Sequence, residues 1–517
     1  MTSGPPVVRA SGLLTAALIT AISLAGCASD KIVFRDRQPF NNPPAAALGF
    51  LGYYDAATKQ TTCGNCHAEI QGSWKGTKHA SAWANLNAST SKAAECYGCH
   101  TVNGKGNAAV GTVAGYDAVK EATYNDVQCE SCHGAGLTHV EGVGQATLIK
   151  PLAKVSMTGT GTCGDCHTGA HQPFAEEWKL SGHGKVTTRG SNAECAGCHD
   201  GRGALKRWGV TDNYQEKADP TNYQAVTCAV CHNPHGSENP HQLRFSLTST
   251  DPDQNLCMQC HLRRIEPEFT ASTPHAPQGA VLLGFAGYKP PGFEYDSSRI
   301  YGSHATTKNP KLCAGCHISK FTVTDKLTGA FTFNATGHLM RPIPCLDATG
   351  KPTGDKTCPY TATARSWQTC TVCHGSAEAA ATAFNSARDL MKFLADQLWL
   401  NLNNDGNLQA APTDGGMLAT LKATRPTEWS TTDNKITPAE GAEFNARLCG
   451  EYNQSNSDNS KGTHNRFLCQ ALLVATINYV RSYYSLPAAS REVQARIDSP
   501  IGGEFRSSMR VSRMPPR

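Results

Sequence analysis

The chain has 517 residues, of which 23 are cysteine, 48 glycine and 28 proline, and its formal net charge is +5. Hydrophobic residues make up 39% of the sequence and aromatic residues 7%, which is little for the several apolar cores that a chain of this length ordinarily builds. The composition argues against a set of ordinary globular domains and predicts a loop-rich chain that folds around inserted groups.

Residues 1–26 have the features of an export signal. Arg9 precedes an apolar run over residues 13–24, and a Leu-Ala-Gly-Cys sequence ending at Cys27 follows. This sequence resembles the bacterial lipobox, in which the cysteine is diacylated, although a chance cysteine after an ordinary signal would look the same. No later segment has the roughly 18 uninterrupted apolar residues of a membrane-spanning helix. We therefore expect an exported protein with a lipid anchor at Cys27, followed by a linker over residues 27–60.

Eighteen of the cysteines form nine Cys-x-x-Cys-His motifs. Two thiols three residues apart can each bond one vinyl group of a haem, and the histidine after them can ligate the iron from one face. Zinc sites and thioredoxin-type redox sites also use Cys-x-x-Cys, but neither needs the histidine in every copy. We therefore predict nine covalent haems c. The attachment residues are Cys63, Cys66 and His67; Cys96, Cys99 and His100; Cys129, Cys132 and His133; Cys163, Cys166 and His167; Cys195, Cys198 and His199; Cys228, Cys231 and His232; Cys257, Cys260 and His261; Cys313, Cys316 and His317; and Cys370, Cys373 and His374.

Nine irons each need a sixth ligand, and ten histidines lie outside the motifs. Methionine is the other common axial ligand, but no methionine recurs at a fixed distance from the motifs. We therefore expect histidine on both faces of every iron. The predicted distal ligands are His79, His139, His171, His183, His235, His275, His304, His338 and His464. His241 is left over as a spare or surface residue, because His235 can serve the same neighbourhood.

Two expected distal histidines lie too close in sequence to a motif to ligate its own haem. His235 is three residues after His232, and His171 is four after His167. An extended segment of that length spans roughly 10–14 Å, which is too short to pass around the edge of the porphyrin. These histidines, and by similar reasoning His139, are expected to ligate a neighbouring haem and to hold haems close together.

The first six motifs form two three-haem units, residues 61–145 and 146–245, that repeat with a period of 99–100 residues. Each unit has Cys-Gly-x-Cys-His, then Trp-Lys-x-Thr/Ser-x-His, then Ala-Glu-Cys-x-Gly-Cys-His, and a third motif after a valine. Stacked repeats form a quasi-linear array, so we predict a row of haems. Trp74 and Trp178 are expected to pack against haem faces, although ordinary core positions would look the same.

Residues 246–375 hold the last three motifs at wider spacing, and the proline and glycine between them indicate long loops. Four further cysteines lie in what we expect to be an oxidising compartment. Disulfides Cys345–Cys358 and Cys449–Cys469 would close the shortest loops, while other pairings and free thiols remain open.

Residues 376–490 differ from the rest of the chain. Apolar residues spaced by three and four predict an amphipathic helix over residues 376–400 and a second from His464 to about residue 484. We expect a C-terminal helical element packed on the last haems, with His464 as a distal ligand, and a flexible tail over residues 491–517.

A calcium site is a weaker candidate at residues 401–406, where Asn-x-Asn-x-Asp-Gly has half of a calcium-loop pattern. Pro412 stands where the bidentate glutamate belongs. An ordinary asparagine–glycine turn is therefore the favoured alternative.

Together these features predict a mainly α and irregular fold, in which short helices surround a haem chain and a helical element follows. The positive charge is misleading. Nine oxidised haems with ionised propionates would bring the mature chain to about −5, so nucleic-acid binding has no support.

The lipobox at Cys27, the nine motifs, and the segments around His275 and His338 resemble multihaem c-type cytochromes of dissimilatory metal-reducing bacteria, especially their outer-membrane lipoproteins. The first half, with Cys129-Glu-Ser-Cys132-His133-Gly, is similar to the nitrifier tetrahaem cytochrome and hydroxylamine oxidoreductase superfamily. The resemblance implies electron export to extracellular metal oxides. Its expected partners are other cytochromes and a porin-like barrel.

Three functions follow as hypotheses. Irons with histidine on both faces cannot bind substrate but exchange electrons readily, which favours an electron conduit. An enzyme that converts nitrite or hydroxylamine needs one iron with an open position. A filament subunit needs a histidine that ligates a haem of the next protomer, and the surplus histidine allows this.

Overall fold

The computed structural model describes residues 48–499, except 108, 110–112, 211–212, 220, 272, 294–303, 326, 399–415 and 451–456. The predicted lipobox at Cys27, the calcium-loop pattern and the residues after 499 therefore lie outside the described residues. Within the described part of the chain, no helix is both long enough and apolar enough to cross a membrane.

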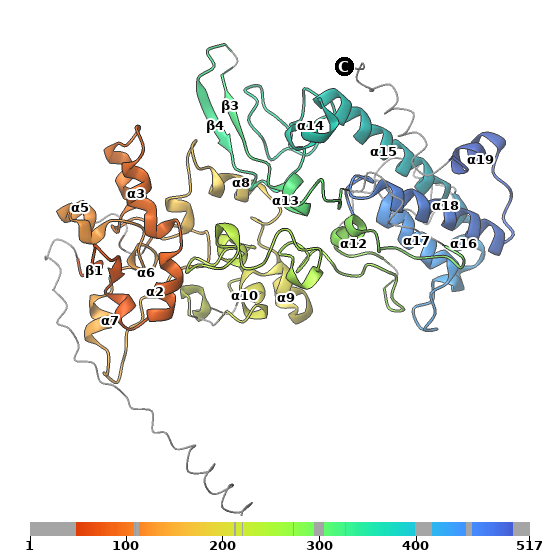
Figure 1. Cartoon of the computed structure of the whole chain (residues 1–517). Coiled ribbons are helices and arrows are strands. Elements are labelled where there is room, and N and C mark those ends of the chain that lie inside the picture. Colours follow the sequence, from red (N-terminus) through yellow and green to blue (C-terminus); the bar gives the residue numbers. More distant parts are fainter. Residues whose placement is uncertain are drawn as a thin grey trace, which may run out of the picture. The chain divides into compact units, whose positions relative to one another are not determined.

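Short helices joined by irregular segments make up most of the described chain (Figure 1), which confirms the predicted mainly α and irregular fold. The helices are α2 (Ala68–Lys75), α3 (Ala82–Asn87), α4 (Tyr97–His100), α5 (Tyr116–Val119), α6 (Glu130–His133), α7 (Leu137–Glu141), α8 (Phe174–Leu180), α9 (Ala193–His199), α10 (Gly201–Arg207), α11 (Cys228–Cys231), α12 (Gln278–Leu283), α13 (Leu312–His317), α14 (Gln368–His374), α15 (Ala377–Leu398), α16 (Gly416–Thr424), α17 (Pro438–Cys449), α18 (Arg466–Tyr483) and α19 (Arg491–Ile497). Two antiparallel hairpins pair β1 (Tyr53–Asp55) with β2 (Gln60–Thr61) and β3 (Phe321–Thr324) with β4 (Phe331–Ala335).

The helices from α2 to α11 are too short to be stable alone, because isolated helices under about 12 residues are marginal in water. Their apolar clusters are also small, and one of them consists of Ala204, Leu205, Tyr214 and Val230 with a few partly buried neighbours. Little apolar surface is thus buried between the elements themselves. This agrees with a chain that completes its core with inserted groups.

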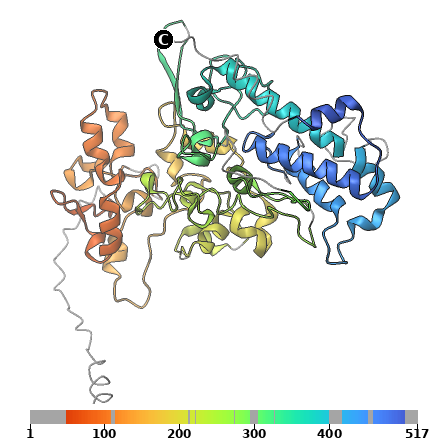
Figure 2. The same ribbon diagram turned by 45° about the vertical axis from the view of Figure 1, so that its right-hand side comes forward.

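The helical element after residue 376 has a conventional apolar core. Helices α15, α17 and α18 lie side by side in both views (Figures 1 and 2). Leu394, Leu448 and Leu472 are among the residues they bury completely or almost completely. The predicted helix over 376–400 is confirmed as α15, and the predicted helix from His464 is confirmed as α18.

Helices α16, α17 and α19 in this region were not predicted. Helix α17 begins with a capping box, in which the Thr437 side chain accepts from the Glu440 amide and the Glu440 carboxylate accepts from the Thr437 amide. Nearly every residue of α17 is buried, including both of its glutamates, so its sequence has no polar face to mark a helical period.

Candidate haem-binding site

In the attachment motifs the two thiols and the histidine lie on one face of a single helical turn. The histidine amide donates to the carbonyl of the first cysteine, at 2.9 Å for His67, His167, His232 and His261 and 3.0 Å for His133. Residues i, i+3 and i+4 share a face in such a turn. The backbone therefore presents both thiols and the imidazole to one side, as covalent haem attachment requires.

Seven motif histidines face a second imidazole from a distant part of the chain, with ring centroids 6.0 to 6.5 Å apart. The pairs are His67–His139, His167–His79, His133–His235, His261–His183, His199–His275, His232–His338 and His317–His464. Two metal–nitrogen bonds of about 2 Å and two half-rings add up to about 6 Å. Each pair thus leaves the space that one iron bound by both imidazoles would occupy.

The expected cross-pairing is present in this geometry. His235 faces His133 rather than its sequence neighbour His232, and His139 faces His67 rather than His133. The assignment of these rings as iron ligands stays a prediction.

Burial keeps many of these imidazoles neutral, which is the form that binds a metal. Burial lowers the pKa of His183 to about 4, and the nearby His261 ring lowers it further. Burial likewise lowers the pKa of His79 to about 4, with a smaller contribution from His167. A neutral ring keeps one nitrogen lone pair available for iron.

Hydrogen bonds from Nδ1 fix which nitrogen carries that lone pair. Nδ1 of His133 donates to the Pro151 carbonyl at 2.8 Å, and Nδ1 of His317 donates to the Met340 carbonyl at 2.9 Å. A proton held on Nδ1 leaves Nε2 unprotonated and sets the plane of the ring. The groups that accept these Nδ1 hydrogen bonds are mostly backbone carbonyls, so the sequence carries no direct sign of them.

His304 lies near the histidine of the ninth motif. Its ring is near enough to His374 to lower the pKa of that histidine, after burial as the larger cause. Nδ1 of His304 donates to the Thr463 carbonyl at 2.6 Å. The segment before α18 therefore orients His304 and also carries His464.

His100 is the remaining motif histidine, and the structure does not bring the predicted distal ligand His171 to it. His171 is exposed and stacks on Phe331 of β4, with ring centroids 4.5 Å apart and planes 9° apart. His241 is exposed as well, and its backbone carbonyl accepts from Nδ1 of His232. All nineteen histidines are among the described residues, and none of their rings pairs with that of His100.

Thiols of different motifs lie beside one another in three recurring relations. In the first relation, direct side-chain interactions join the first cysteines of two motifs. The pairs are Cys63 with Cys129, Cys163 with Cys228 and Cys257 with Cys313. In the second relation, burial raises the pKa of Cys132 and of Cys316, and the nearby thiols Cys163 and Cys370, respectively, raise it further. The interaction with Cys313 and burial raise the pKa of Cys257, and the nearby thiol of Cys231 makes a smaller contribution. In the third relation, direct side-chain interactions join the second cysteines of two motifs, Cys99 with Cys166 and Cys198 with Cys260.

These relations order the motifs in space. The first, third, fourth, sixth, seventh, eighth and ninth motifs follow one another as neighbours, while the second lies beside the fourth and the fifth beside the seventh. The first cysteines of the seventh and eighth motifs interact directly, as do the first cysteines of the first and third motifs. The region after residue 246 therefore continues the repeat without a middle motif.

The tryptophans of the repeat hold the turns that carry two distal histidines. The Trp74 indole donates to the Val127 carbonyl at 3.0 Å, and the Val127 amide donates to the His79 carbonyl at 3.1 Å. In the second unit Trp178 and Val226 make the same two bonds around His183, at 2.8 and 3.1 Å. The predicted duplication thus extends to individual hydrogen bonds.

Glu177 is a positioning residue that the sequence did not reveal. Its buried carboxylate accepts from the backbone amides of Thr336 and His338, at 2.8 and 2.7 Å, and from the Thr336 hydroxyl. It thereby holds the segment that presents His338. The corresponding residue in the first unit is Ser73, so the repeat gave no signal of this role.

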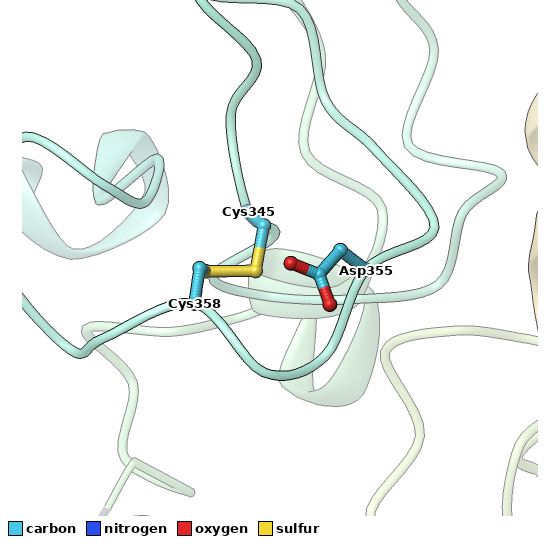
Figure 3. A group of neighbouring side chains, drawn as sticks. All are labelled: Cys345, Asp355 and Cys358. Carbon is cyan, nitrogen blue, oxygen red and sulfur yellow. A yellow bond between two sulfur atoms is a disulfide. The ribbon is translucent and has the colours of Figure 1, made fainter.

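Two disulfides join the four cysteines outside the motifs, Cys345 with Cys358 and Cys449 with Cys469. These are the pairs that short loop closure favours. Figure 3 shows the Asp355 carboxylate beside the first disulfide. Both sulfurs are bonded to each other and offer no thiolate, so this group is not a metal site.

Comparisons with known proteins agree with these features. A family model described as cytochrome c554 and c-prime matches residues 62–134, and one described as a doubled CXXCH motif matches residues 221–264. The chain is 26% identical over 290 residues to the C-type polyheme cytochrome OmcB of Geobacter sulfurreducens. The aligned region covers 49% of this chain and 35% of OmcB. It is 26% identical over 255 residues to the multiheme cytochrome MtrA of Shewanella baltica, which covers 46% of this chain and 69% of MtrA.

The chain is also 28% identical over 204 residues to the C-type polyheme cytochrome OmcC of Geobacter sulfurreducens, which covers 32% of this chain and 25% of OmcC. The matched region thus spans about a third of OmcB, at 35% of its length. No solved structure matches the chain. The motifs, the paired imidazoles and these relatives together support haem c attachment, and they confirm that the chain is similar to multihaem c-type cytochromes.

Proposed function

We propose that this chain is a nonahaem c-type cytochrome that conducts electrons. Bound haem c supplies a one-electron iron couple at each motif. The protein would hold each group by two thioethers and a motif histidine. A second imidazole faces the motif histidine at seven of the nine sites, and His304 lies near His374 at the ninth. Closed coordination favours electron exchange over substrate binding.

The observation that carries the proposal is the unbroken succession of neighbouring motifs. Cys132 lies near Cys163 across the boundary between the two units, and Cys231 lies near Cys257 across the next boundary. Imidazoles cross the same boundaries, because His79 faces His167 and His183 faces His261. Groups attached at these sites would be held close enough to pass electrons from one unit to the next.

The route and the partners are part of the proposal. The lipobox pattern at Cys27 favours an exported lipoprotein of the outer membrane. Its partners would be other cytochromes as electron donors, a porin-like barrel, and an extracellular acceptor such as a metal oxide.

Haem stoichiometry and complete redox cycling test the proposal. The mature protein should contain nine haems by pyridine haemochrome assay and by intact mass. A low-potential donor should reduce all of them, and a soluble ferric chelate should reoxidise all of them. Fewer haems, or a fraction that no donor reduces, would contradict a nine-membered conduit.

His100 supports a second candidate function at one haem. Among the described histidines no ring faces that of His100, and Nδ1 of His100 donates to the Ala82 carbonyl at 2.8 Å and fixes the ring. A haem attached at Cys96 and Cys99 would then have an open face. Such a site binds small molecules and could support nitrite or hydroxylamine chemistry.

We expect the ferric protein to show one high-spin haem in nine, and the ferrous protein to bind one carbon monoxide. The reason is that His171 is engaged with Phe331 rather than with His100. The variant His171→Ala should leave both signals unchanged. A wild-type spectrum that is entirely low-spin, with a high-spin signal only in His171→Ala, would show that His171 closes this site.

A further inference from the structure

The histidines that face one another differ in what their Nδ1 groups bind. His133, His139, His232, His304 and His317 donate to backbone carbonyls. His261 lies 3.2 Å from the Gln278 side-chain oxygen. Nδ1 of His464 donates to Asp458 Oδ1 at 2.6 Å. Among all nineteen histidines, which the described residues include, His464 is the one that donates to a carboxylate.

Asp458 is held in place from several directions. Its side chain is 2% exposed, and its amide donates to the Leu448 carbonyl at the end of α17. The Ser460 hydroxyl donates to its second carboxylate oxygen. Gln278 of α12 donates to the Asp458 carbonyl at 3.4 Å. Among the described residues, His464 is the only ion-pair partner of this buried carboxylate.

His464 faces His317, with ring centroids 6.2 Å apart. This step rests on the proposed function, because it takes His464 as the distal ligand of the haem at Cys313 and Cys316.

We propose that Asp458 lowers the midpoint potential of the haem attached at Cys313 and Cys316. A carboxylate that accepts from Nδ1–H gives the imidazole more negative charge and makes it a stronger donor to iron. A stronger axial donor and a buried negative charge both stabilise ferric over ferrous iron. The distal imidazole of the ninth motif, His304, donates to a neutral carbonyl and lacks this effect.

The consequence is a step in potential near the end of the motif succession. At the seventh motif, Nδ1 of His261 faces a side-chain amide oxygen, and at the ninth, Nδ1 of His304 donates to a backbone carbonyl. At the eighth motif between them, Nδ1 of His464 donates to a carboxylate. Of these three haems, the one at the eighth motif would have the lowest midpoint potential. Asp458 is thus a positioning and tuning residue that acts on the iron through His464.

The test is the variant Asp458→Asn in the full holoprotein, followed by a spectroelectrochemical redox titration and electron paramagnetic resonance. Asparagine has nearly the same shape and keeps a neutral acceptor for Nδ1. We expect one of the nine midpoint potentials to shift upward and one low-spin ferric signal to shift with it. Asp458→Glu keeps the charge and should largely restore both.

Glu443→Gln is the matched control, because Glu443 is a buried carboxylate of α17 that binds Trp429 and Arg447 and no histidine. Its titration should equal that of the wild type. If Asp458→Asn retains nine haems and its titration and spectrum superimpose on the wild type, the inference is wrong while the conduit stands. If the wild type lacks nine haems, the proposed function itself fails.

Discussion

Removal of the seventh haem should interrupt conduction through the protein. The variant Cys257→Ala/Cys260→Ala deletes both thioether bonds at the motif that lies next to the sixth and the eighth. In the structure Cys257 is the neighbour of both Cys231 and Cys313. We expect the current through a protein film to fall close to that of an electrode without protein, because the seventh motif lies between the sixth and the eighth in the proposed succession.

The fifth haem provides a control of the same chemical size. Its second thiol, Cys198, lies beside Cys260 of the seventh motif. The variant Cys195→Ala/Cys198→Ala therefore removes a side branch and should keep most of the current. Both variants should contain eight haems and have matching circular dichroism. Equal currents in the two variants would refute the linear order of motifs.

The attachment sites could be predicted from sequence because their chemistry is local. Two thiols and a histidine within five consecutive positions need only one helical turn to face the same group. The duplication was also visible, because Trp74 and Trp178 recur with the same neighbours. The structure adds that these tryptophans bind the carbonyls of Val127 and Val226 rather than merely filling space.

The partner of each distal histidine could not be predicted, because pairing depends on contacts between distant segments. His338 faces His232, and the carboxylate of Glu177, 161 residues earlier in the sequence, holds the backbone amide of His338. A glutamate beside a tryptophan carries no sign of this contact. Asp458 was missed for the same reason, since its role depends on the fold of the segment between α17 and α18.

His171 shows the limit of counting ligands. Nine irons and ten histidines suggested that each site would be closed, and the short distance from His167 required a different haem as its target. The argument from reach excluded one partner but named no other. In the structure the ring of His171 lies on Phe331, an apolar contact with a hairpin that the spacing of motifs did not predict.

The disulfide Cys449–Cys469 should matter both for stability and for haem ligation. It joins the last residue of α17 to the first turn of α18, and the two cysteines are 20 positions apart in the sequence. The closed loop carries Asp458 and His464 and also the Thr463 carbonyl that orients His304. In the chain-entropy model a crosslink over a loop of this length contributes roughly 3 kcal/mol.

We expect the variant Cys449→Ala/Cys469→Ala to lose about that free energy of unfolding in the helical element and to gain a high-spin signal from loosened distal ligands. The variant Cys345→Ala/Cys358→Ala removes a crosslink over 13 positions and should lose a similar amount. That loop carries no distal histidine, so its haem spectrum should stay unchanged. Chemical denaturation followed by circular dichroism measures the first effect, and the ferric absorption spectrum measures the second. If both variants lose stability and neither changes spin state, the disulfide holds the helices together without holding the ligands, because His464 and His304 would then keep their places through the packing of α17 against α18 alone.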